Sequence, residues 1–152
     1  MAALAEDFVD EEDLQIFKER YEKEETAGMV TNDIQFQYGM CLIKSKYRND
    51  IRKGIELFQD LCTRGCDQRD FLFFLALGYY KLGQWEPAMK CIQRLLNIEP
   101  NNHQAIEMKE LINKKMNKDG LMGVAIAGGA VVGGILGIVG GSIILGYKLL
   151  KK

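Results

Sequence analysis

The stretch that decides the fold lies at residues 72–101 and reads LFFLALGYYKLGQWEPAMKCIQRLLNIEPN. Its apolar residues recur at intervals of three and four, which is typical of amphipathic helices and not of strands. Gly83 divides the stretch and Pro100 ends it, so the sequence predicts two helices joined by a tight turn. Ala76 and Ala88 are small enough to let the two helices cross closely.

The spacing of residues in this stretch matches the tetratricopeptide repeat, an antiparallel helix pair that stacks into a superhelix. Ile92 and Leu95 stand in for the usual Phe and Ala of that repeat. Because the match extends over the whole stretch, stacked repeats are favoured over a generic helical bundle. The matching residues are Leu75, Ala76, Tyr79, Tyr80, Leu82, Gly83, Trp85, Ala88 and Pro100.

An earlier stretch repeats this pattern more weakly. It has no terminal proline, and it carries three extra residues between its helices, Ser45, Lys46 and Tyr47. We therefore expect two repeats, at about 33–66 and at about 69–102. The equivalent positions of the first repeat are Tyr38, Gly39, Leu42, Gly54, Phe58 and Leu61.

Two repeats alone bury little core, so such arrays need further units or caps. A helix over 10–25, with Asp10 as its capping residue, and a helix at about 102–118 supply those caps. The expected fold class is all-α, a six-helix tetratricopeptide-like superhelical bundle plus a single C-terminal transmembrane helix. The remaining helices are expected at about 31–45, 50–63, 70–83 and 86–98. The last cap would pack through Met108, Leu111 and Ile112.

The charges divide the chain at Gly120. Overall, 20 Lys and Arg residues face 21 Asp and Glu residues, which argues against a nucleic-acid binder. All the acidic residues lie at or before Asp119, and residues 121–147 carry no charge. As a helix this stretch spans about 40 Å, and a bilayer core is about 30 Å thick. We expect a transmembrane anchor over 121–147 rather than a buried core helix.

The position of this anchor predicts a tail-anchored topology, with insertion after translation and a cytosolic N-terminus. The acidic N-terminus resembles neither a secretory signal nor a mitochondrial presequence. A weakly hydrophobic, lysine-flanked anchor is typical of mitochondrial and peroxisomal membranes, so Lys148, Lys151 and Lys152 are candidate targeting residues. The expected parts are an arm at 1–9, the helical bundle at 10–118, the anchor at 121–147 and a basic tail at 148–152.

Within the anchor, Gly129, Gly133, Gly137 and Gly141 recur at intervals of four. Small residues at this spacing form a smooth face on which a second helix packs closely. Two interpretations stay open: the face mediates homotypic association, or the glycines only lower the hydrophobicity of the anchor.

The first helix of each repeat lines the concave face in such a superhelix. That assignment gives an apolar partner groove, which lacks the Lys and Asn of carboxylate-clamping repeats and suits an amphipathic helix or an extended apolar segment. The acidic arm, with Leu4 and Phe8, is an alternative cover for this groove, and a partner would then displace it. The groove residues are Phe36, Met40, Ile43, Phe73, Leu77 and Tyr80.

The residues required for catalysis or cofactor binding are missing from the sequence. Cys62 and Cys66 do not have the spacing of a zinc finger, and we expect Cys41 and Cys91 to be buried. His103 is expected at the surface of a helix start, and no phosphate-binding glycine loop occurs. We therefore expect no enzymatic activity, no metal and no cofactor.

Four stretches of the chain carry a family resemblance: FQY at 36–38, CLIKSKY at 41–47, DIRKGI at 50–55 and KDGL at 118–121. Together they resemble the mitochondrial fission protein family (fission protein one). The resemblance implies an adaptor of the mitochondrial outer membrane and of peroxisomes that recruits a dynamin-related GTPase, directly or through other adaptors. It also implies partners among Rab GTPase-activating proteins, and a bilayer and a second copy are further expected contacts.

Two other functions fit parts of the pattern. An organelle import receptor or co-chaperone would use the repeat groove, although the carboxylate clamp is missing. A membrane-deforming protein would act through the glycine face of its anchor alone.

Overall fold

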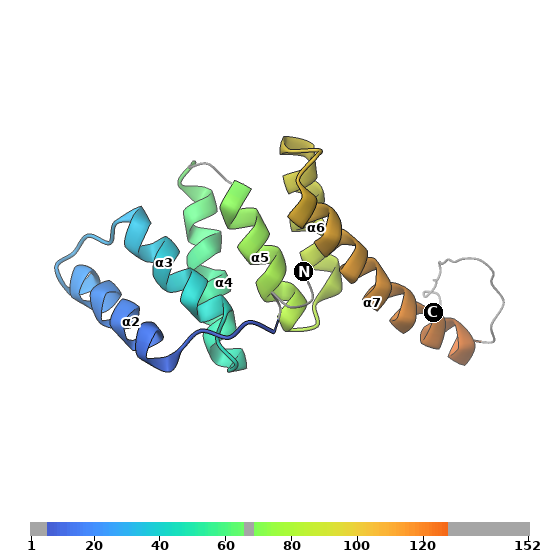
Figure 1. Cartoon of the computed structure of the whole chain (residues 1–152), viewed down its shortest axis with the longest axis horizontal. Helices are drawn as coiled ribbons and strands as arrows, with labels where there is room; N and C mark the ends of the chain where they lie inside the picture. The colour runs from blue at the N-terminus through green and yellow to red at the C-terminus, as the bar shows by residue number, and fades with distance from the viewer. Residues whose placement is uncertain (1–5, 66–68, 128–152) are drawn as a thin grey trace. The chain divides into compact units, whose positions relative to one another are not determined.

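The structure, a computed structural model, describes residues 6–65 and 69–127, and every element within them is an α-helix (Figure 1). These helices match the expected all-α, six-helix tetratricopeptide-like architecture. They are α2 (Glu11–Thr26), α3 (Asn32–Ile43), α4 (Arg48–Thr63), α5 (Arg69–Lys81), α6 (Trp85–Ile98) and α7 (His103–Ala127).

The chain divides into two compact units, Met1–Ile112 and Asn113–Lys152. In the first unit, successive helices run in opposite directions and contact one another in order from α2 to α6 (Figure 1). Helix α3 also contacts α5, so the first helices of the two repeats lie against each other.

Helix α7 continues past the point where the sequence predicts a break. It extends through Gly120 to Ala127, into the uncharged stretch. The two glycines in this part, Gly120 and Gly123, each cost a helix only about 1 kcal/mol, and helix-forming residues follow them. Near its start, α7 fully buries Ala105, Met108 and Ile112, which confirms that the predicted apolar face packs onto the domain.

The greater part of the predicted anchor lies outside the described residues. This includes the glycine face at Gly129, Gly133, Gly137 and Gly141 and the tail lysines Lys148, Lys151 and Lys152. Among the helices between residues 6 and 127, none combines the length and the apolar character needed to span a bilayer.

The turn between α2 and α3 shows how local sequence sets a helix boundary. The Thr31 hydroxyl accepts a hydrogen bond from the Ile34 N–H at 3.3 Å and caps α3. The Glu24 carboxylate in turn accepts from the Thr31 N–H at 2.8 Å and from its hydroxyl at 3.0 Å. Asp10 holds the N-cap position of α2, but its side chain makes no capping hydrogen bond, unlike the prediction.

Three helical glycines allow the helices of the core to approach closely. A Cβ on Gly39 would lie 3.0 Å from the Phe58 ring, and one on Gly54 would lie 3.0 Å from Leu42 Cβ. The tightest place is Gly78, where a Cβ would lie 2.6 Å from Ile43 Cδ1. Ala76 and Ala88 are fully buried, as expected for residues where two helices cross.

The inserted residues form the connection between α3 and α4. Ser45 is buried, and its hydroxyl donates to the Asp50 carboxylate at 2.7 Å and accepts from the Tyr47 N–H at 3.1 Å. Helix α4 starts at Arg48, before the predicted boundary at Asn49 and Asp50. The difference has a physical reason: Asp50 binds Ser45 from inside the first turn of α4 instead of standing before the helix.

Candidate partner-binding site

The six predicted groove residues fall into two groups in the structure. Phe36, Met40 and Tyr80 are half-buried and keep some surface. Phe73 is 7% exposed, and Ile43 and Leu77 have no exposed surface. Ile43 and Leu77 therefore belong to the core, which is a correction to their placement on the groove surface. The prediction that these residues bind a partner stays a prediction.

A cluster of phenylalanine rings joins α3, α4 and α5 below this surface. Phe36 lies 5.5 Å from Phe58 and 5.8 Å from Phe74 between ring centroids, both in edge-on geometry. The Phe73 and Phe74 rings also meet edge-on at 5.6 Å. Such pairs stabilise by about 0.5–1.5 kcal/mol beyond the burial of their area. The cluster fixes two predicted groove residues, Phe36 and Phe73, in place.

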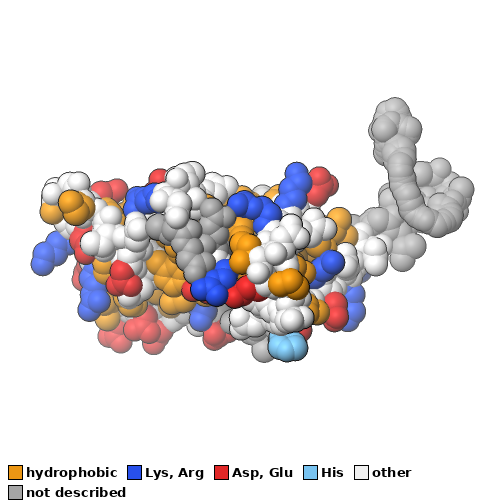
Figure 2. Space-filling model, turned by 90° about the horizontal axis from the view of Figure 1, so that it is seen from above, with side chains coloured by type: hydrophobic (Ala, Val, Ile, Leu, Met, Phe, Trp, Pro, Cys, Tyr) orange, Lys and Arg blue, Asp and Glu red, His pale blue; other side chains and the backbone are white. Residues whose placement is uncertain are grey.

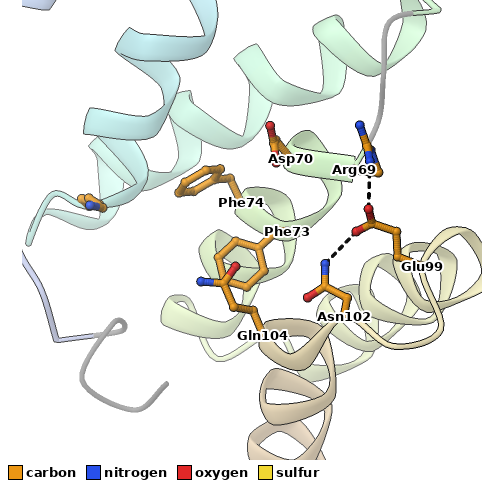
Figure 3. Close-up of a pocket in the computed structure, with 8 residues that line it drawn as sticks. Arg69, Asp70, Phe73, Phe74, Glu99, Asn102 and Gln104 are labelled. Carbon is orange, nitrogen blue, oxygen red and sulfur yellow. Dashed lines mark hydrogen bonds and ion pairs between the residues drawn. The ribbon is translucent and has the colours of Figure 1, made fainter.

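A cavity of about 160 Å³ opens at the Phe73 side of this surface. Figure 3 shows Phe73 and Phe74 on α5 and Gln104 on α7, with Arg69 and Asn102 directed at the Glu99 carboxylate. The Arg69–Glu99 ion pair spans 2.9 Å, and the Asn102 amide donates to Glu99 at 2.8 Å. The lining residues are Lys44, Arg69, Asp70, Phe73, Phe74, Glu99, Asn102 and Gln104.

Basic, acidic and amide side chains line the cavity beside Phe73 and Phe74, although the sequence predicts an apolar groove. Arg69 is paired with Glu99, and Lys44 is paired with Asp7 at 3.5 Å. The cavity therefore combines two aromatic rings with charged and amide groups. Figure 2 shows one face of the molecule, on which hydrophobic side chains gather between groups of basic and acidic ones.

The described part of the arm, residues 6–9, lies along the end of α3. The Val9 N–H donates to the Lys44 carbonyl at 3.0 Å. The Lys81 ammonium lies 5.0 Å from the centroid of the Phe8 ring. Burial, and in second place the negative charge of Glu6, raises the pKa of the Tyr80 phenol. The charge of Glu6 in the arm thus acts on Tyr80, one of the predicted groove residues.

Lys81 fixes the loop on which the arm rests. Its ammonium donates to the Ile43 carbonyl at 2.7 Å and to the Ser45 carbonyl at 3.0 Å. Burial and the positive charge of Lys44 lower the pKa of Lys81 from 10.5 to about 8, and the Asp7 carboxylate opposes this shift. A half-buried cation therefore links α5, the α3–α4 loop and the arm.

Sequence reasoning missed Lys44 and Lys81, as well as the charged lining of the cavity. The available signal was charge: residues 1–25 hold ten acidic and three basic residues, and residues 26–120 hold more basic than acidic ones. That asymmetry is consistent with attraction between the arm and the domain, but it does not say which lysines take part.

Cys41, Cys91 and His103 lie where they are expected. Cys41 and Cys91 are buried, and burial raises the pKa of the Cys91 thiol to about 11. His103 is exposed as the first residue of α7. Cys66 lies outside the described residues. Across residues 6–65 and 69–127, no three His, Cys, Asp or Glu side chains come together in a way that could hold a metal ion.

Two stacked helix pairs, a capping helix on each side and a cavity that combines aromatic rings with charged and amide groups define a protein-interaction domain of the tetratricopeptide-repeat class. Two family models match the chain: the Fis1 N-terminal tetratricopeptide repeat over residues 33–65, and the Fis1 C-terminal tetratricopeptide repeat over residues 69–121. The chain belongs to the mitochondrial fission 1 protein family, a family of fission adaptors.

Relatives and solved structures agree with this membership. The chain is 45% identical to the mitochondrial fission 1 protein of Homo sapiens over 144 residues, which cover 92% of this chain and 95% of the relative. It is 35% identical to that of Mycosarcoma maydis, covering 91% and 92% of the two chains. The crystal structure of Fis1 from Saccharomyces cerevisiae is similar with a TM-score of 0.72 at 28% identity, covering 78% of this chain and 92% of that one.

A second crystal structure shows yeast Fis1 in complex with an Mdv1 fragment that contains N-terminal extension and coiled-coil domains. It is similar to this chain with a TM-score of 0.71 at 28% identity, covering 76% of this chain and 91% of that one. That yeast protein thus binds another protein through the same fold.

Proposed function

We propose that this protein is a tail-anchored adaptor of the mitochondrial outer membrane, and also of peroxisomes, that recruits dynamin-related GTPase machinery for organelle fission. Recruitment is direct or passes through other adaptors, and Rab GTPase-activating proteins are further candidate partners. The protein catalyses no reaction itself. Membership of the fission family and the Mdv1 complex of its yeast relative support this proposal.

The observation that carries the proposal is the arm on the site. Residues 6–9 contact Lys44 at the end of α3 through Asp7 and Val9, and Lys81 of α5 through Phe8. Residues 6–9 cover this surface only loosely. Such a surface suits a partner that displaces residues 6–9 and binds in their place. Phe8 itself stays 54% exposed, so the cover is incomplete. The arm therefore gates the groove, and a partner displaces it.

The anchor supplies the location in this proposal. Confinement to a membrane raises the effective concentration of weakly bound partners. A GTPase that assembles on the membrane surface then meets many copies of a weak site. Association of anchors through Gly129, Gly133, Gly137 and Gly141 would add to this clustering.

The test substitutes one groove residue in the full-length protein. Tyr80→Glu places a charge at a half-buried residue of the predicted groove, and we expect it to reduce recruitment of the GTPase to mitochondria, with the protein still folded and on the membrane. Met29→Glu is the matched control, because Met29 is 75% exposed in the turn between α2 and α3. Fluorescence microscopy of the GTPase, with circular dichroism of both variants, decides the outcome. Equal recruitment by both variants would show that this groove is not the recruiting surface.

A further inference from the structure

We propose that the site selects a partner segment in which an acidic residue is followed directly by an aromatic one, as Asp7 is followed by Phe8 in the arm. The inference rests on the proposed function, because it treats the arm as the segment that a partner replaces. It adds the chemistry of that partner segment, residue by residue.

Three consecutive residues of the arm contact the domain in three different ways. The Asp7 carboxylate lies 3.5 Å from the Lys44 ammonium, and the Phe8 ring lies 5.0 Å from the Lys81 ammonium. The Val9 N–H donates to the Lys44 carbonyl at 3.0 Å. The two side chains select the acidic and the aromatic residue, and the main-chain hydrogen bond fixes the register between them.

The receiving groups belong to the domain, and contacts within the domain hold Lys81. The Lys81 ammonium is held by the Ile43 and Ser45 carbonyls at 2.7 Å and 3.0 Å. Lys44 is the C-cap of α3, and the last carbonyls of a helix have no partner within it. When Val9 leaves, the Lys44 carbonyl needs another donor, which the main chain of a bound segment provides.

The charge around this position favours an acidic segment. Lys44 and Lys46 lie at the end of α3, where Lys44 pairs with Asp7 and Lys46 with Glu11, and Lys81 donates to the Ile43 carbonyl beside them. A basic segment would meet three like charges. An acidic residue in the place of Asp7 completes the same ion pair.

The arm holds this position weakly, as expected of a segment that must be displaced. The Asp7 side chain is 59% exposed and Phe8 is 54% exposed. Ion pairs and cation–π contacts with exposed partners each stabilise only weakly, because water screens the charge. A partner with the same short motif and further contacts in the groove would therefore replace the arm.

The register makes a sharp prediction about the third residue of the motif. Proline has no N–H, so a proline in the place of Val9 removes the hydrogen bond to the Lys44 carbonyl. An acidic–aromatic pair followed by proline should bind poorly. The inverted pair, aromatic then acidic, has the same composition but puts each side chain at the wrong lysine.

The test measures peptide binding to the full-length protein in detergent micelles. The protein carries Asp7→Asn and Phe8→Ala to weaken its own arm, and the probe is a fluorescent peptide with the sequence of residues 4–12, LAEDFVDEE. We expect fluorescence anisotropy to show tighter binding to this variant than to the unaltered protein. Inverting the Asp–Phe pair, or replacing the following Val by Pro, should each weaken binding by about three- to tenfold.

Substitutions in the domain test whether Lys44 selects the acidic residue of the motif and Lys81 the aromatic one. Lys44→Glu should reverse the charge preference, so that a peptide with Lys in the place of Asp binds better than the parent peptide. Lys81→Met should abolish the preference for Phe over Ala at the next position. Lys18→Glu, on the exposed surface of α2, is the control with the same change in net charge as Lys44→Glu.

The outcomes separate the two proposals. Equal binding of the parent, inverted and proline peptides would overturn the motif, and so would equal binding by the arm-weakened and unaltered proteins. Selective peptide binding, together with GTPase recruitment that Tyr80→Glu leaves intact, would instead support the motif and reject the adaptor function of the groove.

Discussion

At the scale of single residues, Lys81 shows how burial changes the chemistry of a side chain. It stands at the end of α5 and donates to two carbonyls of the α3–α4 loop while facing the Phe8 ring. Burial and Lys44 disfavour its charged form, and Asp7 favours that form. The charge that holds the arm is therefore itself sensitive to pH.

We expect Lys81 to titrate at about pH 8 rather than at its ordinary pKa of 10.5. Nuclear magnetic resonance of the lysine Cε carbons checks this, with Lys81→Met to assign the signal. Asp7→Asn should lower the pKa of Lys81 further, because it removes a negative charge, and Lys44→Met should raise it. Titration of Lys81 near 10.5 would show that its side chain is not held in this position.

The same pKa sets the direction of a pH effect on stability. The folded chain releases the Lys81 proton near pH 8 and the unfolded chain near pH 10.5, so the unfolded state binds more protons in between. The contribution of Lys81 to the free energy of unfolding therefore rises with pH across that window. At the same time the cation–π contact with Phe8 is lost, so the domain gains stability while the arm loosens.

The burial of Ile43 and Leu77 could not be predicted from residue patterns. Helical periodicity places both on the apolar side of their helices, next to true surface residues such as Tyr80. Whether they reach the surface depends on the neighbouring helices. Ile43 Cδ1 fills the space left by the missing Cβ of Gly78, a residue of another helix, so no pattern within α3 could place Ile43 in the core.

At the scale of elements, the α3–α4 loop depends on one buried hydroxyl. Ser45→Ala removes the donor to Asp50 and the acceptor of the Tyr47 N–H, so we expect a loss of about 1–3 kcal/mol in the free energy of unfolding. Lys46→Ala is the matched control in the same loop, and because it removes an exposed ion pair with Glu11 and an exposed cation–π contact with Tyr47, its cost should be about 0–1 kcal/mol. Urea unfolding in micelles, followed by Trp85 fluorescence, measures both. A cost for Ser45→Ala no larger than that of the control would contradict the structural role of the hydroxyl.

The helices and the repeat pattern were predictable from the sequence, since glycine and proline breaks and small residues at helix crossings are local signals. Gly83, for example, adopts the positive φ of 76° that its turn requires. The two boundaries that differ had no such signal. The start of α4 depends on the Ser45–Asp50 hydrogen bond, and the continuation of α7 depends on the absence of any strong helix breaker after Gly120.

At the scale of the whole molecule, the residues of the candidate binding site and those of the predicted membrane anchor lie in different parts of the sequence. The arm, loop and cavity all lie within residues 6–104, and the predicted anchor begins only at residue 121. The charge asymmetry of the sequence is consistent with attraction between the arm and the domain, and equally with an acidic face exposed to solvent. It could not predict the site, because the site combines residues of α3, α5, α7 and the loop before α7.

We expect residues 118–152, fused to a fluorescent protein, to carry it to mitochondria, because the uncharged stretch is long enough to span the membrane and basic residues flank it. Replacing Lys148, Lys151 and Lys152 together by Ser should move a substantial part of the fusion to other membranes. Replacing the same three by Arg is the control that keeps the charge. Co-localisation with a mitochondrial marker measures the effect, and an equal distribution of all three fusions would rule out a targeting role for the basic tail.

The glycines at 39, 54 and 78 have a consequence for the thermodynamics of recognition. Helices in contact at positions without a Cβ have little room to slide or to separate without opening a void. Such a frame is pre-organised, so a ligand has little conformational entropy of the helices to remove when it binds. Most of the entropy that changes on binding then belongs to the arm, which gains freedom as the ligand loses it. The exchange of one short segment for another is therefore nearly balanced in entropy, and small differences in side-chain contacts decide which segment is bound.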